Sequence, residues 1–370
     1  MICWRFGLVI MKIGVITVAD SSKGLHKEAE LIAWAMNKSP NCTIEIIHLN
    51  TIQTDSINAK SVPSNQPTSW SIVTHSSIQD WINTVDILFL LESINTNVLD
   101  YAIEKTKVVL VPNLEWATVK EGNDQSTLSW VNLVQKYNSK GMIVIAKSTM
   151  IWNSLQSNEI TSKLVNWSSS EPISTIRVHQ MANKISTILM NAGQGGWCNR
   201  RGVDVFVEAI KLMPKNNLFN FVLKTIKPWG EYNLGPLPEN LTLIEGYISR
   251  IELEQLIAST DLIIYPSRFE GFGLSMLEAM HLGIPVMCTD GWPMNEIQTI
   301  KSRLLMIDSV REKQIRLAMA FEPDPKSIVE NLSVLQKLNI RQEFPIELVT
   351  KGLRERQDLF VKTLHSIAGL

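Results

Sequence analysis

Short apolar runs rich in β-branched residues alternate along this chain with segments whose apolar positions recur at helical spacing. In the first half the runs occupy residues 13–18, 43–48, 86–91, 107–111 and 142–146. In the second half they occupy residues 185–190, 219–224, 241–244, 261–265, 284–288 and 303–307. Helical spacing is clearest at residues 26–36, 203–213 and 251–258. Strands that alternate with helices in this way predict a parallel α/β architecture.

The alternation stops and restarts near residues 168–184, which indicates two successive Rossmann-like units. A chain of 370 residues also exceeds the usual size of a single core. We predict an N-terminal domain over residues 1–178 and a C-terminal domain over residues 179–344. The amphipathic segment 345–370 is expected to form a helix that packs back on the first domain. Residues 51–76, dense in Ser, Thr, Asn and Pro, are interpreted as a long, partly ordered surface excursion.

The charge balance is close to neutral, with 35 Lys+Arg against 36 Asp+Glu. A dedicated nucleic-acid binder usually carries a basic stripe, so no nucleic-acid partner is indicated. The four cysteines are scattered without a C-x-x-C pair, which argues against a zinc site and a disulfide framework and favours a reducing, cytoplasmic compartment. The sequence contains no run of 18 apolar residues, so no membrane-spanning helix is predicted.

Candidate chemistry concentrates in residues 261–297, which begin D-L-I-I-Y-P-S-R-F-E-G-F-G-L. This segment predicts a buried strand, a turn, a glycine loop and then a helix. Glycines let the backbone approach a ligand closely, and a helix start presents free N–H groups suited to a phosphate. Ligands of open α/β sheets bind at the carboxyl ends of strands, where this loop falls.

Two carboxylates, Glu270 and Glu278, flank the glycine loop with seven residues between them. If both lay on one helix they would share a face about 12 Å apart. That separation exceeds the roughly 6.5–9.5 Å of paired carboxylates that act on one glycosidic bond. It suits two anchors that hold opposite ends of an elongated ligand.

Four features of this region resemble family 4 glycosyltransferases. They are the E-x7-E spacing, the surrounding P-S-x-x-E-G-F-G-L and L-E-A-M-x-x-G-x-P-V, and an upstream R-R-G-V-D-V-F-V-E-A. The resemblance covers residues 185–300. It implies a GT-B fold, with two Rossmann-like domains facing across a cleft. It also implies a nucleotide-diphosphate sugar as co-substrate, retention of anomeric configuration, and no cofactor or obligatory metal.

The resemblance further assigns residues on the donor side. Glu278 would hold the ribose hydroxyls and Glu270 would face the transferred sugar. The backbone of residues 271–275 would meet the sugar and the diphosphate; this loop consists of Gly271, Phe272, Gly273, Leu274 and Ser275. Arg201 and Lys224 match the two basic positions that neutralise the leaving group, with Arg200 as a spare cation, and Glu296 is a candidate neighbour of the donor sugar.

The acceptor side departs from the family pattern, because no histidine follows the fourth predicted strand. Asn113, Glu115 and Trp116 occupy that place and are candidates to replace it. Gly24, in the turn after the first strand, is placed like the family's acceptor-side loop. We therefore expect a retaining glycosyltransferase that moves a sugar to an acceptor hydroxyl, with the neutral charge favouring a glycan.

Other functions remain open at this point. The alternative from a different class is a non-catalytic nucleotide-sugar-binding or scaffold protein of the same fold, which the missing histidine favours. A nucleotide-sugar epimerase or a phosphorylase is a third reading, although no pyridoxal lysine motif is evident. A dehydrogenase is disfavoured because no G-x-G-x-x-G follows the first strand.

Overall fold

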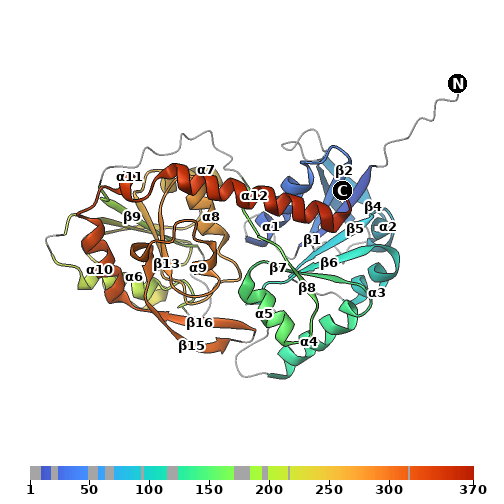
Figure 1. Ribbon diagram of the computed structural model, residues 1–370, viewed down its shortest axis with the longest axis horizontal. Coiled ribbons are helices and arrows are strands. Elements are labelled where there is room, and N and C mark those ends of the chain that lie inside the picture. Colours follow the sequence, from blue (N-terminus) through green and yellow to red (C-terminus); the bar gives the residue numbers. More distant parts are fainter. Residues whose placement is uncertain are drawn as a thin grey trace. The chain divides into compact units, whose positions relative to one another are not determined.

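The computed structural model in Figure 1 divides the chain into two compact units. Unit 1 contains Met1–Ser170 and Gln357–Leu370, and unit 2 contains Glu171–Arg356. The predicted domain boundaries were 178/179 and 344/345. The structure describes residues 10–17, 24–48, 57–62, 71–92, 96–114, 124–170, 184–193, 199–215, 217–315 and 317–370.

Unit 1 is built on an eight-stranded sheet with the order β4-β3-β2-β1-β5-β6-β7-β8. The strands are β1 (Met11–Thr17), β2 (Cys42–His48), β3 (Ile57–Val62), β4 (Ser71–His75), β5 (Ile87–Leu91), β6 (Lys107–Val111), β7 (Ile143–Ala146) and β8 (Ser162–Leu164). Six of them pair in parallel, whereas β3 and β4 are antiparallel additions at one edge. The predicted surface excursion at residues 51–76 is therefore ordered in part, as the strands β3 and β4 at this edge of the sheet.

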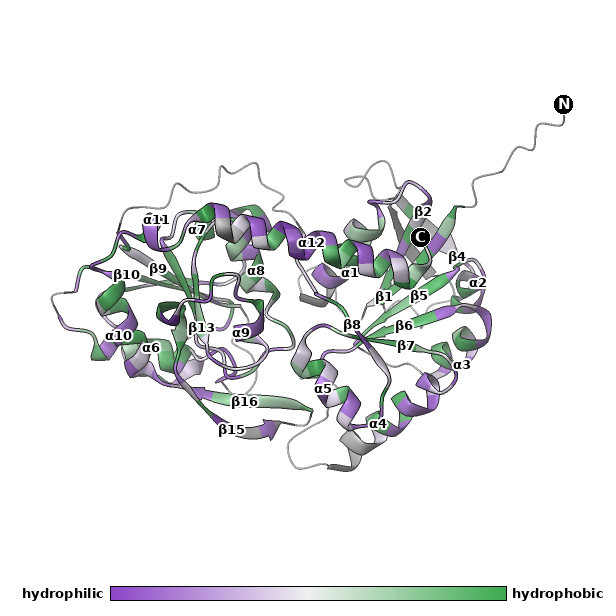
Figure 2. Ribbon diagram, viewed as in Figure 1, coloured by the Kyte–Doolittle hydropathy of each residue, from purple (hydrophilic) through white to green (hydrophobic). Residues whose placement is uncertain are grey.

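The helices of unit 1 are α1 (Gly24–Met36), α2 (Ile78–Ile82), α3 (Thr96–Lys105), α4 (Asp124–Asn138) and α5 (Thr149–Ser157). The central strand β5 is buried along its whole length, which explains its unbroken apolar sequence. Figure 2 shows the same hydrophobic character along β5, β6 and β7. Trp81 of α2 packs so closely on β1 that a Cβ at Gly14 would come within 2.8 Å of its ring.

Unit 2 contains a six-stranded, fully parallel sheet with the order β11-β10-β9-β12-β13-β14. Its strands are β9 (Thr187–Gly193), β10 (Asn220–Thr225), β11 (Leu241–Glu245), β12 (Leu262–Tyr265), β13 (Val286–Thr289) and β14 (Met306–Ile307). The strand predicted at residues 303–307 begins as a 3-10 turn, Arg303–Leu305, and only its last two residues pair.

Around this sheet lie α6 (Val203–Leu212), α7 (Arg250–Ala258), α8 (Leu274–His281), α9 (Met294–Ile297), α10 (Pro325–Leu335), α11 (Ile340–Glu343) and the 3-10 turn Trp229–Tyr232. A separate antiparallel hairpin, β15 (Ser309–Ile315) and β16 (Ala318–Pro323), follows β14 outside the main sheet (Figure 1). One buried apolar cluster joins the strands to α6 and α10.

The last helix, α12 (Ile346–Ala368), starts in unit 2 and ends in unit 1. Its second half belongs to the core of unit 1, because the Phe360 ring lies 5.0 Å from the Trp167 ring in an edge-to-face contact. Gln357 Nε2 donates to the Ser169 carbonyl at 2.8 Å, and His365 Nε2 donates to the Ala35 carbonyl at 2.9 Å. The predicted return of the C-terminal helix to the first domain is confirmed.

Candidate functional site

The glycine loop of unit 2 follows the carboxyl end of β12, as the sequence predicted. Pro266 and Ser267 turn the chain, and α8 then begins at Leu274 behind Gly273, whose φ of +97° is the left-handed conformation that glycine tolerates best. A Cβ at Gly273 would come within 3.0 Å of Ile297 Cδ1. No side chain caps the start of α8, so its first N–H groups are suited to an anionic ligand.

Glu270 and Arg201, two of the predicted catalytic residues, are brought into direct contact. Arg201 Nη1 donates to Glu270 Oε1, and Arg200 Nη2 lies 4.0 Å from Glu270 Oε2. Glu270 is only 4% exposed, so this carboxylate depends on the two guanidinium groups for charge compensation. The loop before α8 and the turn before α6 therefore form one charged cluster.

Gly202 explains how the two segments come so close. Its φ is +69°, and a Cβ there would collide with the carbonyl oxygen of Pro266. The backbone of Arg268 also donates to the Arg200 carbonyl at 2.8 Å. The R-R-G turn is thus seated directly on the P-S turn, which only a residue without a side chain permits.

Tyr265, the last residue of β12, lies among the charged groups of the site and was not predicted. Burial raises the pKa of its phenol above the usual range, Arg201 opposes this shift, and Glu278 and Glu270 add to it. Its hydroxyl also lies 3.5 Å from the Ser275 carbonyl at the start of α8. A polar-tipped aromatic at the end of the apolar run L-I-I-Y was the only signal for it in the sequence.

The predicted spacing of Glu270 and Glu278 along one helix is wrong. Glu278 lies on α8, whereas Glu270 precedes the helix and is separated from it by the glycine loop. The left-handed residue Gly273 breaks the helical path, so helix geometry does not set the distance between the carboxylates. Both carboxylates still add to the raised pKa of the Tyr265 phenol, so both act on the same buried group.

The remaining loop residues differ in exposure. Gly271, Phe272 and Gly273 are buried, while Leu274 and Ser275 are half-buried. Glu296, on α9, is half-buried and interacts with Arg356 of α12. The Arg356 guanidinium lies 5.6 Å from the centre of the Phe272 ring, and burial lowers its pKa to about 10. No motif around Arg356 distinguishes it from other helix residues in the sequence.

Lys224 lies at the carboxyl end of β10, and its side chain bonds to backbone carbonyls. Its Nζ donates to the carbonyls of Gly246 and Thr225, and burial lowers its pKa. Strand β9 separates β10 from β12, so the two strands lie about 10 Å apart. Among the contacts described in unit 2, none joins Lys224 to Arg201 or Glu270.

Arg268 links the loop that carries Glu270 to other elements of unit 2. Its guanidinium forms two bonds of 2.9 Å with Asp204 on α6 and bonds of 2.7 and 2.6 Å with Glu322 on β16. A further bond of 2.9 Å reaches the Asn199 carbonyl. One side chain therefore ties the loop around Glu270 to α6, to the turn that carries Arg201, and to the β15–β16 hairpin.

The acceptor-side candidates lie in unit 1. Gly24 is the first residue of α1, and Asn113 is a buried residue after β6 whose Oδ1 accepts a hydrogen bond from Lys147. Glu115 and Trp116 lie outside the described residues. Lys147 was not predicted, because an isolated lysine after a strand has no distinguishing pattern.

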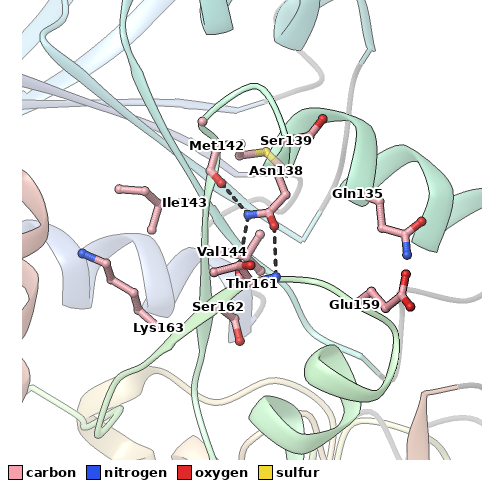
Figure 3. Close-up of a pocket in the computed structure, with 11 residues that line it drawn as sticks. Gln135, Asn138, Ser139, Met142, Ile143, Val144, Glu159, Thr161, Ser162 and Lys163 are labelled. Atoms are coloured by element: carbon pink, nitrogen blue, oxygen red, sulfur yellow. Dashed lines mark hydrogen bonds between the residues drawn. The ribbon is translucent and has the colours of Figure 1, made fainter.

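A hollow of about 580 Å³ opens beside α4, β7 and β8 in unit 1 (Figure 3). Asn138 bonds there to the carbonyls of Met142 and Thr161 at 2.8 and 3.0 Å. These residues precede β7 and β8, so the hollow lies at the amino ends of the strands, away from the edge where such sheets bind ligands. Its lining carries none of the predicted residues.

Two further properties concern the described ranges as a group. No cluster of three or more His, Cys, Asp or Glu residues able to hold a metal ion occurs within them. Within the same ranges, no helix combines the length and apolar character needed to cross a membrane.

Comparison with known proteins places the site in context. Residues 186–315 match the family described as Glycosyl transferases group 1. O-antigen chain mannosyltransferase B of Escherichia coli is 30% identical over 105 residues, which are 26% of this chain and 28% of that protein. Lipopolysaccharide glucosyltransferase WaaG of Escherichia coli strain K12 is 29% identical over 93 residues, 24% of this chain and 25% of that protein. The chain thus matches about a quarter of the length of these relatives.

Solved structures extend the likeness to both units. The glycosyltransferase structure from Rickettsia africae ESF-5 aligns over 96% of this chain and 98% of its own, with a TM-score of 0.59 and 15% identity. At that identity the likeness concerns the fold. Together with the two parallel sheets, it confirms the predicted GT-B class.

Proposed function

We propose, from the match of residues 186–315 to the family described as Glycosyl transferases group 1, that the whole chain is a retaining glycosyltransferase that uses a nucleotide-diphosphate sugar. The observation that carries the proposal is the Arg201–Glu270 contact beside the uncapped start of α8. It combines a cation for phosphate, a carboxylate for sugar hydroxyls and free backbone N–H groups within one buried cluster.

In the proposed reaction the acceptor hydroxyl attacks the anomeric carbon from the face that the diphosphate leaves. The bond from the anomeric carbon to the acceptor oxygen forms, the bond to the phosphate oxygen breaks, and the hydroxyl proton passes to the departing diphosphate. Arg201 stabilises the charge that develops on that diphosphate. Lys224 donates to two carbonyls, and the third N–H of its ammonium would serve the same charge.

The other roles follow the same arrangement. Glu278 would hold the ribose and Glu270 the transferred sugar, with residues 271–275 against the diphosphate. Arg200 would supply additional positive charge, and Glu296 would lie near the donor sugar. We propose that the reaction needs no cofactor and no obligatory metal, that the acceptor is a glycan, and that the protein works in the cytoplasm.

The first test is binding. Thermal shifts with uridine, guanosine and adenosine diphosphates should identify one base that stabilises the protein, because a ligand that binds only the folded state raises its stability. Glu278→Gln should weaken that shift, since the amide replaces one of the two acceptor oxygens. Glu208→Gln, an exposed change on α6, should not alter it. A protein that none of the three diphosphates stabilises would contradict the proposal.

The second test is turnover with the sugar forms of the preferred nucleotide. Release of nucleoside diphosphate and a product of retained configuration are expected. Arg201→Gln should lower kcat and kcat/KM together, by roughly 100-fold, as for a group that acts in the transition state. An inverted product would exclude retention. Nucleotide binding without any turnover would favour the non-catalytic alternative.

A further inference from the structure

A buried ionic cluster lies in unit 1 at the carboxyl ends of two central strands. Lys147 directly follows β7, Asn113 lies two residues beyond β6, and Glu28 projects from α1. Their exposed fractions are 0%, 7% and 5%. Carboxyl strand ends are where open α/β sheets bind ligands, so the position itself suggests a role beyond packing.

Lys147 is the centre of this cluster. Its Nζ donates to Glu28 Oε1 at 2.7 Å and to Asn113 Oδ1, and it lies 5.6 Å from the centre of the Trp167 ring. Burying an ammonium and a carboxylate costs several kcal/mol for each charge, which their attraction only partly offsets. A hydrophobic pair would fill the same space without that cost, so stability alone does not account for the cluster.

The cluster fixes the orientation of the Asn113 amide. An ammonium group has three donors and no acceptor, so only Oδ1 of the amide can face Lys147. The amide NH₂ must then point away from Lys147. Within the described ranges, Lys147 is the only hydrogen-bond partner of the Asn113 side chain. Asn113 therefore presents two N–H donors with a defined direction.

We propose that Lys147 is a positioning residue that holds Asn113 so that its amide donates to a hydroxyl oxygen of an uncharged acceptor sugar. This inference rests on the proposed glycosyltransferase function and names the class of its acceptor. Lys147 and Glu28 cancel in charge, and Glu28 Oε2 has no hydrogen-bond partner among the described residues. A neutral cluster of this kind offers no net attraction for a phosphate or a carboxylate, whereas an amide N–H can bind an uncharged hydroxyl oxygen, so an uncharged acceptor group fits it best.

The same geometry limits the chemistry of the site. An amide neither takes up nor releases a proton near neutral pH, so Asn113 orients the acceptor and does not deprotonate it. The acceptor proton must leave by another route, and the diphosphate provides one in the proposed reaction. Asn113 thus works as a donor only.

The test compares a neutral with an anionic probe. Transfer from the preferred nucleotide sugar is measured to methyl α-D-glucopyranoside and to glucose 6-phosphate. The wild type should use the neutral glycoside with the higher kcat/KM. Asn113→Asp keeps the shape but replaces the NH₂ by an oxygen, so KM for the glycoside should rise about 10-fold, the value of one hydrogen bond, while kcat changes less.

The pair Lys147→Met/Glu28→Gln removes both charges together and leaves Asn113 unfixed. Its KM for the glycoside should rise similarly, and adding Asn113→Asp should produce no further rise, because residues that act through one contact are not additive. Lys105→Met, an exposed lysine of unit 1, serves as the control.

The thermal shift by nucleoside diphosphate reports unit 2 separately and should persist in every variant. The inference would be overturned if the KM effects of the variants were additive, or if Asn113→Asp left KM unchanged. It would also be overturned if the wild type preferred glucose 6-phosphate, or if it bound nucleotide but transferred no sugar to the glycoside. Absence of nucleotide binding in the wild type would instead count against the proposed function.

Discussion

At the scale of single residues, the contact between Arg201 and Glu270 depends on a position that carries no chemistry. Gly202 combines a left-handed backbone with a site where the Pro266 carbonyl occupies the place of a Cβ. Either condition alone would favour glycine. Together they determine where the R-R turn sits, and hence which side chain meets the buried carboxylate.

Gly202→Ala should therefore destabilise the protein more than Gly235→Ala. Gly235 is also left-handed, with φ of +77°, but a Cβ there would meet no atom within 4 Å. We expect about 1 kcal/mol for the backbone at Gly235, and about 2 kcal/mol more at Gly202 because the turn must shift. Urea unfolding measures both. Equal losses would show that the collision is relieved without cost.

His281, at the end of α8, predicts a pH dependence. Burial lowers its pKa to about 4, and Glu278 only partly opposes this shift. The unfolded chain, with a histidine pKa near 6.5, binds a proton at a pH where the folded protein does not. The contribution of neutral His281 to the stability of the folded protein is thus fully present above about pH 6.5 and is lost as the pH falls toward 4.

His281→Gln should remove this dependence. Between pH 7 and 4.5 the wild type should lose about 2 kcal/mol more of its free energy of unfolding than the variant does. Urea titrations at the two pH values provide the measurement. Parallel losses in both proteins would mean that His281 becomes protonated in the folded state.

At the scale of elements, Arg268 connects parts that are distant in sequence. It joins the loop after β12 to α6 and to β16, and its guanidinium is mostly buried between two carboxylates. Arg303 also meets two carboxylates, Asp290 and Asp308, but its side chain is 63% exposed. Arg268 and Arg303 can therefore be compared directly, because each meets two carboxylates and they differ mainly in how far solvent screens those ion pairs.

Arg268→Gln should cost about 3 kcal/mol, because it leaves two carboxylates near a partly buried site without their cation. Arg303→Gln should cost less than about 1 kcal/mol, as exposed pairs do. Hydrogen exchange at the amides of β16 should accelerate only in the first variant. If both variants lost a similar amount of free energy of unfolding, the ion pairs of Arg268 would contribute little more than exposed surface pairs do.

The same scale shows why parts of the fold escaped prediction. The parallel strands are buried on both faces and read as apolar runs, so most were placed within a few residues. Strands β3 and β15 carry the polar sequences INAKSV and SVREKQI, which periodicity does not separate from loops. The candidate donor-side residues around Glu270 and Glu278 were proposed from a contiguous motif. Arg268, Arg356 and Lys147 were missed because each acts through partners far away in the chain, and Tyr265 was missed because it reads as one more residue of a buried apolar strand.

At the scale of the whole molecule, α12 is shared between the units. Its last three turns carry Phe360, Leu364 and Ile367, all at most 1% exposed, into the core of unit 1. Figure 2 shows the corresponding alternation of hydrophobic and hydrophilic residues along this helix. Unit 1 is therefore assembled from both ends of the chain.

Phe360→Ala should lower the stability of unit 1 by about 3–4 kcal/mol through the cavity beside Trp167. Leu359→Ala, a 47% exposed neighbour on the same helix, should change it by less than about 0.5 kcal/mol. Hydrogen exchange resolved by segment assigns the loss to one unit. Faster exchange throughout unit 2 would contradict the division of the chain into separately packed cores.

The division of α12 also sets an order of events during translation. Unit 2 is one continuous stretch of polypeptide, so all of its residues have been synthesised once the ribosome has passed Arg356. The earlier-made N-terminal portion must wait, because Phe360, the aromatic partner of Trp167, is synthesised only after all of unit 2. The half of the protein that is made first is thus the half that matures last, and a ribosome stalled before Phe360 leaves the nascent core of unit 1 open to chaperones and proteases.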